Sequence, residues 1–569
     1  MATASLTQLL ARFACDLAAT SEGSSPRQRL ASIVLLIIFF KDPKTKNLPK
    51  GSLGFPIIGE TLSFLKAQRK EQGAKWVDER ISEYGSVFKT SLMGSPTVVI
   101  IGQAASIILL IIFSKDRKYK KLPKGSLGFP VIGETLSFLK AQRREQGAKW
   151  VEKRISKYGS VFKTSLMGSP MVIIVGQAGN KFILTMDNEV LASKQPRTIQ
   201  KIGGKNNLFE LTGFRYELVR GAMVSFLKPE SLQSYVKRMD DIVRNLILEE
   251  TRQRDTIKAV IFMKKLTFNV TCDILFGIED ELTKEELFED FGLAFKAIWS
   301  LPLNFPGTVF RKGLQARSRI VDRLLPILRK RKEEISAGTL DPKSDVISCL
   351  LALRDENQEH IDEETIMDNI IMLMIASHDT SATLLCFMIW KLARDPEVHR
   401  KVLEEHEELL KGREKRAGLS WGDIQKMRYT WRVAQELMRL IPIAFGGFRK
   451  ALKDISFGGY DIPKGWQVYW VACGTHMNSD IFERPSEFEP SRFESPSRPI
   501  PPFTYLPFGG GNRMCIGNEF ARVEALTVVH NLVTGYEWSQ LHPEETITRQ
   551  PSPYPSMGLP IKIRPRKSS

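Results

Sequence analysis

The most informative part of the sequence is 507-PFGGGNRMCIGNEFARVEAL-526. Its three consecutive glycines give an irregular backbone that can lie close to a flat partner. Cys515 follows them and stands just before a predicted helix that runs from Asn518 to about Val533. Free backbone N–H groups and the dipole at a helix start favour a thiolate. A lone cysteine is more often an inert core residue, so the neighbouring residues decide its role.

The spacing of those neighbours is specific. Together they spell FxxGxRxCxG, with Phe508, Gly511, Arg513, Cys515 and Gly517 at its fixed positions. This pattern resembles the signature of the cytochrome P450 (haem-thiolate monooxygenase) family. The resemblance implies that Cys515 is the axial ligand of the haem iron, whose electron donation favours O–O cleavage. It also implies that Arg513 pairs with a haem propionate, that Phe508 packs against the thiolate, and that Gly511 belongs to the haem-binding loop.

Two more motifs follow the family's order. In 436-ELMR, Glu436 and Arg439 are three residues apart and share a helical face, where they can pair. On its own, such a pair is usually an ordinary surface ion pair. The later stretch 488-FEPSRF resembles the family element whose arginine, here Arg492, closes the pair into a structural lock.

A long apolar helix, 366-IMDNIIMLMIASHDTSATLLCFMIWKLA-393, is interrupted by polar residues at its centre. Burying polar groups is costly without a role. The segment resembles the family's [AG]GxDT[TS], which implies that Asp379 and Thr380 relay protons during oxygen activation, a form of general acid catalysis. The alternative is a polar patch on an exposed edge of the helix. Ser377 stands where the family usually has glycine.

Two other arginines can be matched to the family. Arg449 in 448-FRKALKD resembles a propionate-binding arginine, and Arg220 follows Tyr216 by four residues, as in a second propionate pair. Tyrosine is unusual at the first position of that pair. Ile443 replaces the second proline of the usual PP sequence after the ExxR helix, in a segment that normally borders the substrate.

Composition limits the remaining classes of protein. With 569 residues, 43% of them hydrophobic, the chain can bury a large core, which excludes global disorder. Six scattered cysteines exclude a disulfide scaffold and a zinc ribbon. The net charge of +18 favours negatively charged partners. Nucleic acid is not expected as a partner, because the basic residues are dispersed among acidic ones.

The N-terminal part contains an internal repeat. Ser32–Ala104 and Ser106–Ala178 align without gaps at an offset of 74 residues and differ at 13 of 73 positions. The second copy continues directly into the rest of the chain, so we expect it to be the integrated one. The first copy would be an extra segment, explained by an exon duplication or a gene-model error. Its strands would leave unpaired edges, which promote aggregation.

Each copy begins with a short apolar run, Ser32–Phe40 or Ser106–Phe113, that is too short to span a bilayer as a helix. A joined helix from Thr97 to Phe113 would reach 17 residues but would remove the first copy's strand Val98–Ile101. We interpret the second run as a short membrane anchor followed by a basic, cytosol-facing linker. The expected domains are 1–31, a leader or transit peptide; 32–105, the extra copy; 106–121, the anchor and linker; and 122–569, the haem-thiolate catalytic domain.

The expected fold class is mainly α with a minor β-sheet, the cytochrome P450 fold. Amphipathic or apolar periodicity predicts helices over 230–256, 318–337, 364–394 and 396–412. The predicted strands are Phe162–Leu166, Met171–Val175 and a hairpin of Ile455–Tyr460 with Gln467–Val471 around the 463-PKG turn.

The resemblance implies haem b, O2, a small apolar substrate, membrane lipid and an NADPH–cytochrome P450 reductase as cofactor and partners. Stretches such as LPKGSLGFPVIGET and FGGFRKALKDISFGGYDIPKGWQV are similar to the plant clan that oxidises terpenoids and steroids, including β-amyrin C-28 oxidases and taxane hydroxylases. That clan implies a large terpenoid or sterol-like substrate and the cytosolic face of the endoplasmic reticulum membrane, with a plastid as the alternative. Two other readings remain: an O2-independent rearranging or dehydrating enzyme, and a non-enzymatic duplicated pseudoenzyme.

Overall fold

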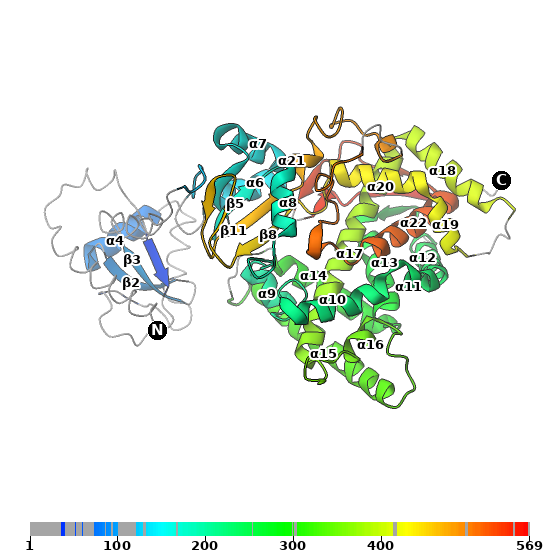
Figure 1. Ribbon diagram of the computed structural model, residues 1–569, viewed down its shortest axis with the longest axis horizontal. Helices are drawn as coiled ribbons and strands as arrows, with labels where there is room; N and C mark the ends of the chain where they lie inside the picture. Colours follow the sequence, from blue (N-terminus) through cyan, green and yellow to red (C-terminus); the bar gives the residue numbers. More distant parts are fainter. Residues whose placement is uncertain are drawn as a thin grey trace. The chain divides into compact units, whose positions relative to one another are not determined.

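The computed structural model describes residues 36–39, 50, 52, 60, 73–85, 87–92, 95–100, 121–128, 133–166, 169–252, 254–298, 300, 304–412, 418–494, 499–549 and 552–566. The chain forms two compact units (Figure 1). One is Met1–Lys120 with Leu303–Thr308, and the other is Lys121–Pro302 with Val309–Ser569. The predicted leader, 1–31, and the apolar run Ser106–Phe113 lie outside the described residues.

The larger unit is built mostly of helices. Several begin where the sequence provides a cap, as at Asp395 and Ser420, whose side chains accept hydrogen bonds from the first turn. The helices are α6 (Thr135–Arg143), α7 (Gly147–Tyr158), α8 (Gln177–Thr185), α9 (Arg197–Gly203), α10 (Gly213–Leu227), α11 (Pro229–Leu232), α12 (Val236–Thr251), α13 (Ala259–Val270), α14 (Glu281–Ile298), α15 (Val309–Ser336), α16 (Val346–Leu351), α17 (Glu363–Arg394), α18 (Pro396–Leu410), α19 (Trp421–Lys426), α20 (Arg428–Leu440), α21 (Cys473–His476) and α22 (Asn518–Gly535).

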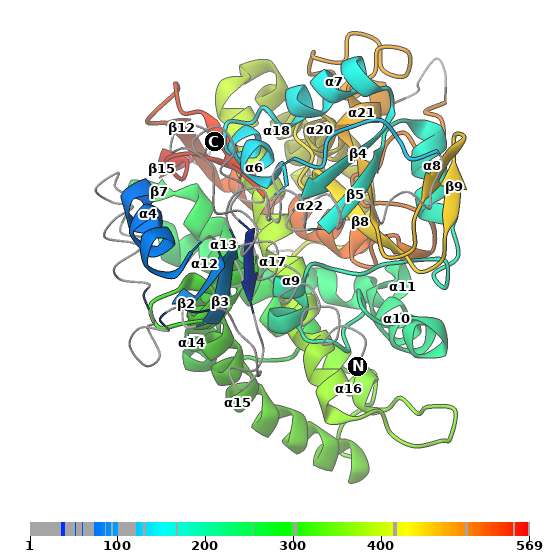
Figure 2. The same ribbon diagram turned by 90° about the vertical axis from the view of Figure 1, so that its left-hand side faces the viewer.

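Helix α17 lies at the centre of this unit, beside α13, α20 and α22 (Figures 1 and 2). Its N-terminus is capped by Asp362, which accepts a hydrogen bond from the backbone of Thr365. Among the described residues, α17 is the one helix long and apolar enough to cross a membrane, but most of it is buried inside the protein. Its hydrophobic length therefore reflects its place in the core.

A five-stranded mixed sheet carries the second copy of the repeat. Its order is β4-β5-β11-β8-β6, and β11 runs parallel to β5 and antiparallel to β8. The second copy therefore pairs with the C-terminal half of the chain. The strands are β4 (Val161–Leu166), β5 (Ser169–Ile174), β6 (Leu191–Ala192), β8 (Gly446–Ala451) and β11 (Gln467–Val471).

The predicted hairpin of Ile455–Tyr460 with Gln467–Val471 is wrong. Instead, β9 (Ile455–Phe457) pairs with β10 (Tyr460–Ile462). Gly458 and Gly459, with φ of +59° and +80°, form the two-residue turn between them. Two adjacent residues with positive φ match the twist of a tight hairpin, so the chain reverses before it reaches the PKG turn.

Three small strand groups complete the structure. In the larger unit, β12 (Tyr536–Gln540), β15 (Pro560–Pro565) and β7 (Thr256–Lys258) form one sheet, and β13 (Ile547–Arg549) pairs with β14 (Pro553–Pro555). The smaller unit contains α4 (Gly73–Tyr84) and a sheet of β1 (Leu36–Phe39), β3 (Ser95–Ile100) and β2 (Val87–Leu92). The predicted class, mainly α with a minor β-sheet, is confirmed.

The first copy of the repeat differs from two expectations. A helix from Thr97 to Phe113 is excluded, because Ser95–Ile100 is a strand. The edge of β3 that a single hairpin would leave open is covered, because β3 pairs with β1 on one side and with β2 on the other, while β1 and β2 are the outer strands of this sheet. The first apolar run, Ser32–Phe40, supplies the covering strand β1.

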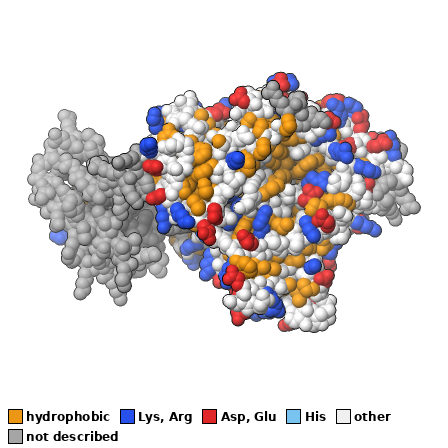
Figure 3. All heavy atoms as spheres, viewed as in Figure 1, with side chains coloured by type: hydrophobic (Ala, Val, Ile, Leu, Met, Phe, Trp, Pro, Cys, Tyr) orange, Lys and Arg blue, Asp and Glu red, His pale blue; other side chains and the backbone are white. Residues whose placement is uncertain are grey.

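Basic and acidic side chains lie interspersed over the face of the larger unit shown in Figure 3. Helix α18 gives an example, because Arg400 pairs with both Glu397 and Glu404 along its exposed side. Such exposed pairs contribute little to stability. They show that many of the chain's basic residues have local acidic partners.

Candidate active site

The loop before α22 takes its shape from Gly511. This residue has φ of +64°, and a Cβ atom there would lie 1.9 Å from the carbonyl oxygen of Leu184. Only glycine fits this combination of backbone angle and close approach. One 3₁₀ turn, Gly511–Arg513, follows, and the backbone N–H of Cys515 donates to the carbonyl of Phe508 at 3.0 Å. These contacts place Cys515 three residues before the start of α22.

Cys515 is a free and exposed cysteine, although nearby protein atoms partly desolvate its sulfur. Burial raises the pKa of its thiol, and a hydrogen bond from the backbone N–H of Gly517 and the charge of Arg220 act in the opposite direction. Binding to a metal ion deprotonates a thiol outright. The site therefore offers a soft sulfur ligand whose thiolate form needs a positive partner.

Arg513 is fixed by groups that carry no negative charge. Its guanidinium donates to Asn188 Oδ1 at 3.1 Å and to the carbonyls of Leu208 and Leu211 at 2.8 and 2.7 Å. It lies 3.5 Å over the ring of Tyr216, whose hydroxyl donates to the carbonyl of Asn512 at 2.6 Å. The unusual tyrosine thus supports both the loop and Arg513.

Two more arginines lie near this loop. Arg449 on β8 is 8% exposed, and its side chain donates one hydrogen bond, to the carbonyl of Phe448. Burial and the charge of Arg513 lower its pKa to about 10. Arg220 on α10 donates to the carbonyl of Met514 at 2.9 Å. Within the described part of the chain, neither these two nor Arg513 has a carboxylate partner, so the cluster suits an anionic group such as the haem propionates.

The middle of α17 has one accessible face. Leu373, Ala376, Ser377 and Thr380 are the residues there that are not fully buried, and their spacing of three or four places them on one side. Thr380 is exposed, and its hydroxyl donates to the carbonyl of Ala376 at 2.7 Å. A hydroxyl is therefore available on an open face of an otherwise buried helix.

Asp379 points into the protein instead. It is 1% exposed and forms an ion pair with Lys264 of α13 at 2.7 Å. Its other carboxylate oxygen accepts from the Ser552 hydroxyl at 3.1 Å, and its carbonyl accepts from Tyr554 at 3.2 Å. The structure thus joins Asp379 to Lys264 and Ser552, whereas the hydrogen bonds of the Thr380 hydroxyl among the described residues stay within its own helix. Sequence reasoning missed Lys264, although a lysine within the apolar helix 259–270 is an available signal.

The other polar residues of α17 also have partners. His378 is buried, its Nδ1 lies 2.7 Å from the Met374 carbonyl, and burial lowers its pKa. An exposed polar patch at His378 and Asp379 is therefore excluded. Ser377, which replaces the usual glycine, accepts a hydrogen bond from Thr271 at 3.3 Å. Thr271 begins a π-helical turn, Thr271–Leu275, so the substitution ties α17 to an irregular part of α13's continuation.

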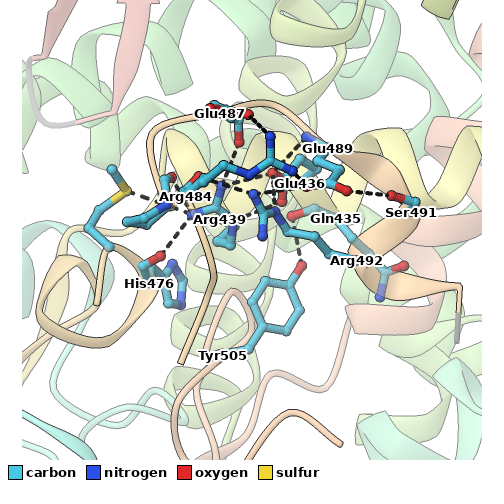
Figure 4. A network of polar contacts seen from close by, with 12 residues as sticks. Gln435, Glu436, Arg439, His476, Arg484, Glu487, Glu489, Ser491, Arg492 and Tyr505 are labelled. Carbon is cyan, nitrogen blue, oxygen red and sulfur yellow. Dashed lines mark hydrogen bonds and ion pairs between the residues drawn. The ribbon is translucent and has the colours of Figure 1, made fainter. Parts of the chain in front are cut away.

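Glu436, Arg439 and Arg492 lie together (Figure 4). Glu436 and Arg439 are fully buried and form two parallel N–H···O bonds of 2.7 Å. Arg492 donates to the same carboxylate at 3.3 Å. Removing one partner of such a buried ion pair destabilises the fold, because the other charge stays buried without compensation.

Arg439 also binds the end of α21 and the chain that follows it. It donates to the carbonyls of His476, Pro485 and Glu487 at 2.9, 2.7 and 3.1 Å (Figure 4). The backbone N–H of Glu489 donates to Glu436 at 3.0 Å. These contacts fasten α20 to the segment that leads toward the cysteine loop.

Ile443 lies in a segment that is held through its backbone. Arg549 donates to the carbonyls of Pro442 and Ile443 at 2.8 and 3.4 Å. The same guanidinium pairs with Glu145 at 2.8 Å. The replacement of proline by Ile443 therefore leaves this segment anchored.

Sequence reasoning also missed a buried acid, Glu524 on α22. It is fully buried, and neither carboxylate oxygen has a direct hydrogen-bond partner. Burial raises the pKa of Glu524 to about 8, and the nearby Ser381 hydroxyl only partly offsets this. Its place among the apolar residues that follow Cys515 is the signal that the sequence provides. At neutral pH this carboxyl is mostly protonated.

Comparison with known proteins agrees with this geometry. The Cytochrome P450 family model matches residues 123–564. The chain is 37% identical to a beta-amyrin 28-monooxygenase of Medicago truncatula, over 81% of this chain and 96% of that one. It is 36% identical to a taxane 13-alpha-hydroxylase of Taxus cuspidata, over 83% and 98% of the two chains.

A solved structure shows the same architecture. The retinoic acid-bound cyanobacterial CYP120A1 matches with a TM-score of 0.70 and 30% sequence identity, over 78% of this chain and all of that one. Family membership makes haem the cofactor and oxidation the reaction class. With the family model spanning most of the chain and its relatives matched over nearly their whole length, this protein belongs to the cytochrome P450 family.

Proposed function

We propose that this cytochrome P450 is a monooxygenase that hydroxylates or oxidises a large apolar terpenoid or sterol-like molecule. Support for the substrate class comes from the relatives, which are named as beta-amyrin monooxygenases and taxane hydroxylases. The observation that carries the reaction class is the accessible Cys515 thiol beside three arginines that lack carboxylate partners in the described structure.

Haem binding follows from that observation. Bound through a cysteine thiolate, haem supplies oxygen activation. Cys515 would ligate the iron, with Phe508 and Gly511 shaping the loop around the sulfur. Arg513, Arg449 and Arg220 would bind the propionates. Burial removes water from the Arg449 guanidinium and lowers its pKa. A propionate carboxylate would offset this desolvation by pairing with the buried charge.

The accessible face of α17 would provide protons. Thr380 holds a hydroxyl on this face, and Asp379 lies behind it with a bond to Lys264, which is partly exposed. This arrangement suits a route in which Lys264 and Asp379 exchange protons with solvent and Thr380 presents a proton at the site. It favours the monooxygenase over a rearranging enzyme, which has little need for such a route.

A redox partner is required by the reaction, and the basic excess of the chain suits an acidic NADPH–cytochrome P450 reductase. We place the protein on the cytosolic face of the endoplasmic reticulum membrane, with a plastid as the alternative. The proposed organisation is a leader at 1–31, an extra repeat copy at 32–105, an anchor and linker at 106–121, and the catalytic domain at 122–569.

The first test is the spectrum of the reduced, carbon monoxide-bound protein expressed with haem. We expect the red-shifted band of a thiolate-ligated carbonyl complex, its loss in Cys515→Ala and its retention in Cys473→Ala. Product formation from fed triterpenes and taxanes in a host with a reductase then tests the substrate class. A wild-type protein without the red-shifted band would support the pseudoenzyme.

A second experiment tests the proton route. In Thr380→Ala we expect haem binding to persist while oxygen consumption becomes uncoupled from product formation. Coupling equal to that of the wild type would remove Thr380 from the route. Product formation under strict exclusion of O2 would instead support the rearranging enzyme.

A further inference from the structure

One short apolar sequence occurs twice in the chain, near the start of each repeat copy. Leu36–Phe39 and Leu110–Phe113 both read LIIF and lie at the repeat offset of 74 residues. In the first copy this sequence is strand β1, which pairs antiparallel with β3. Its partners there are Thr97, Val98, Val99 and Ile100.

The same four positions are used differently in the second copy. Their equivalents, Met171 to Ile174, pair with β11. This strand arrives from the C-terminal half of the chain and runs parallel to β5. Position by position, β1 therefore occupies the edge of the first copy that is the β11-binding edge of the second. Equivalent edges of the two copies therefore pair with two unrelated strands, which run in opposite directions.

The two copies are otherwise built alike. In each, the two repeat strands pair in the same register. Arg80 binds Glu60 and lies over Trp76, as Arg154 binds Glu134 and lies over Trp150. The first copy also has a small core of its own, in which Phe88 and Val99 are buried. It is thus a folded module with a formed strand-binding edge.

Each edge has a nearby and a distant candidate strand. The LIIF sequence lies in the same module as its edge, whereas β11 follows β5 by about 300 residues. Closing a shorter loop costs less entropy, so the local strand is the natural cover when no β11 is available. The larger unit has one β11, and β5 and β8 already hold it. An uncovered apolar edge would be a template for pairing with another chain.

We propose that Leu36–Phe39 is a covering strand for a strand-binding edge at Thr97–Ile100, and that this edge, once bare, pairs with the same edge of a second copy of this chain. The covering strand keeps the duplicated module monomeric. This assignment goes beyond the oxidase function and does not depend on it. It gives the first apolar run a role other than membrane attachment.

The test uses the full-length, haem-loaded protein with Ile38→Pro, because proline removes a backbone donor from the β1 ladder. The matched control is Ile112→Pro, the same residue of the second LIIF sequence, whose module has β11 on its edge. Light scattering in detergent should give at least a doubled mass for Ile38→Pro and an unchanged mass for Ile112→Pro and the wild type. The carbon monoxide spectrum should stay the same in all three.

A second variant identifies the surface that associates. Adding Val98→Pro to Ile38→Pro damages the bared edge itself and should restore the monomer mass. Association that persists in this double variant would show general misfolding and would overturn the proposal, as would a monomeric Ile38→Pro. If Ile38→Pro instead lowers binding to phosphatidylcholine vesicles without changing the mass, the run is a membrane anchor and the proposal fails.

Discussion

Gly511 shows how a neighbouring backbone segment can make glycine necessary at one position of the cysteine loop. Its positive φ and its closeness to the Leu184 carbonyl leave no room for a side chain. The adjacent Gly510 has an extended backbone, and a Cβ there would lie 3.4 Å from the nearest atom. Two neighbouring glycines in one motif therefore carry different constraints.

We accordingly expect Gly511→Ala to lower the haem content severalfold and to destabilise the fold by at least about 2 kcal/mol, the scale of a left-handed conformation plus a steric clash. Gly510→Ala, the matched control, should retain the wild-type haem content. Haem absorbance per protein and urea unfolding check both variants. Equal effects of the two would mean that the loop is not held by the Gly511 contact.

Glu524 predicts a pH dependence of stability. Its pKa is about 8 in the folded protein and about 4.3 in an unfolded chain. The folded state therefore binds the extra proton between these values, so stability falls as the pH rises from about 4 to about 8, by about 1.4 kcal/mol per unit from this group. Above pH 8 the loss is complete.

Glu524→Gln removes this titration and keeps the shape of the side chain. Relative to the wild type, we expect its free energy of unfolding to improve progressively from pH 5 to pH 8. Denaturant unfolding at several pH values measures the difference. A difference that does not vary with pH would mean that Glu524 is ionised in the folded protein.

At the scale of elements, polar contacts decide how α20 and α17 meet their neighbours. Arg439 joins α20 to one carbonyl at the end of α21 and to two in the segment after it, and Lys264 joins α13 to α17 through Asp379. In both cases one carboxylate is almost completely buried. Removing the basic partner would leave an uncompensated buried charge.

For Arg439→Met we expect a loss of about 3 to 5 kcal/mol and little haem-loaded protein, because Glu436 keeps only Arg492 and a backbone N–H as partners. Arg400→Met is the matched control, since Arg400 and Glu397 have the same spacing on the exposed side of α18. It should unfold like the wild type. Calorimetry distinguishes the two, and equal melting temperatures would refute the structural role of Arg439.

Lys264→Met should likewise destabilise the protein, by about 1 to 3 kcal/mol because Lys264 is partly exposed. Adding Asp379→Asn should recover much of that loss, since the buried charge is then absent. Urea unfolding of the two single variants and the double variant gives the coupling energy. Additive effects would show that the 2.7 Å contact does not stabilise the fold.

At the scale of the whole molecule, the first repeat copy belongs to the smaller unit, and the second copy belongs to the larger unit from Lys121 onward. The catalytic unit takes its β5 from the second copy and pairs it with β11, so the first copy is not needed to complete that sheet. Deletion of residues 32–105 should therefore leave haem incorporation and the carbon monoxide spectrum unchanged or improved. Loss of haem in the deletion variant would show that the first copy supports the catalytic unit.

Local sequence was sufficient for much of the site. FxxGxRxCxG requires a glycine-rich turn before a helix, and the structure has that turn before α22. Glu436 and Arg439 pair because three residues on a helix bring their side chains to one face. The long helices α12, α15, α17 and α18 follow from hydrophobic periodicity, because burial of one helical face repeats along the chain.

Contacts between distant segments could not be predicted in this way. Three features depend on segments that lie far apart in the sequence. They are the pairing of β11 with β5 and β8, the Lys264–Asp379 ion pair, and the burial of Glu524 without a direct hydrogen-bond partner. The LIIF sequence makes the same point, because its first occurrence forms strand β1 by pairing with β3, a segment distant in the sequence. The sequence alone determined the family and the class of reaction, and it predicts that Cys515 is the haem ligand. Only the tertiary structure decided which partner each strand and each buried charge finds, because such choices depend on competition among segments that local patterns do not record.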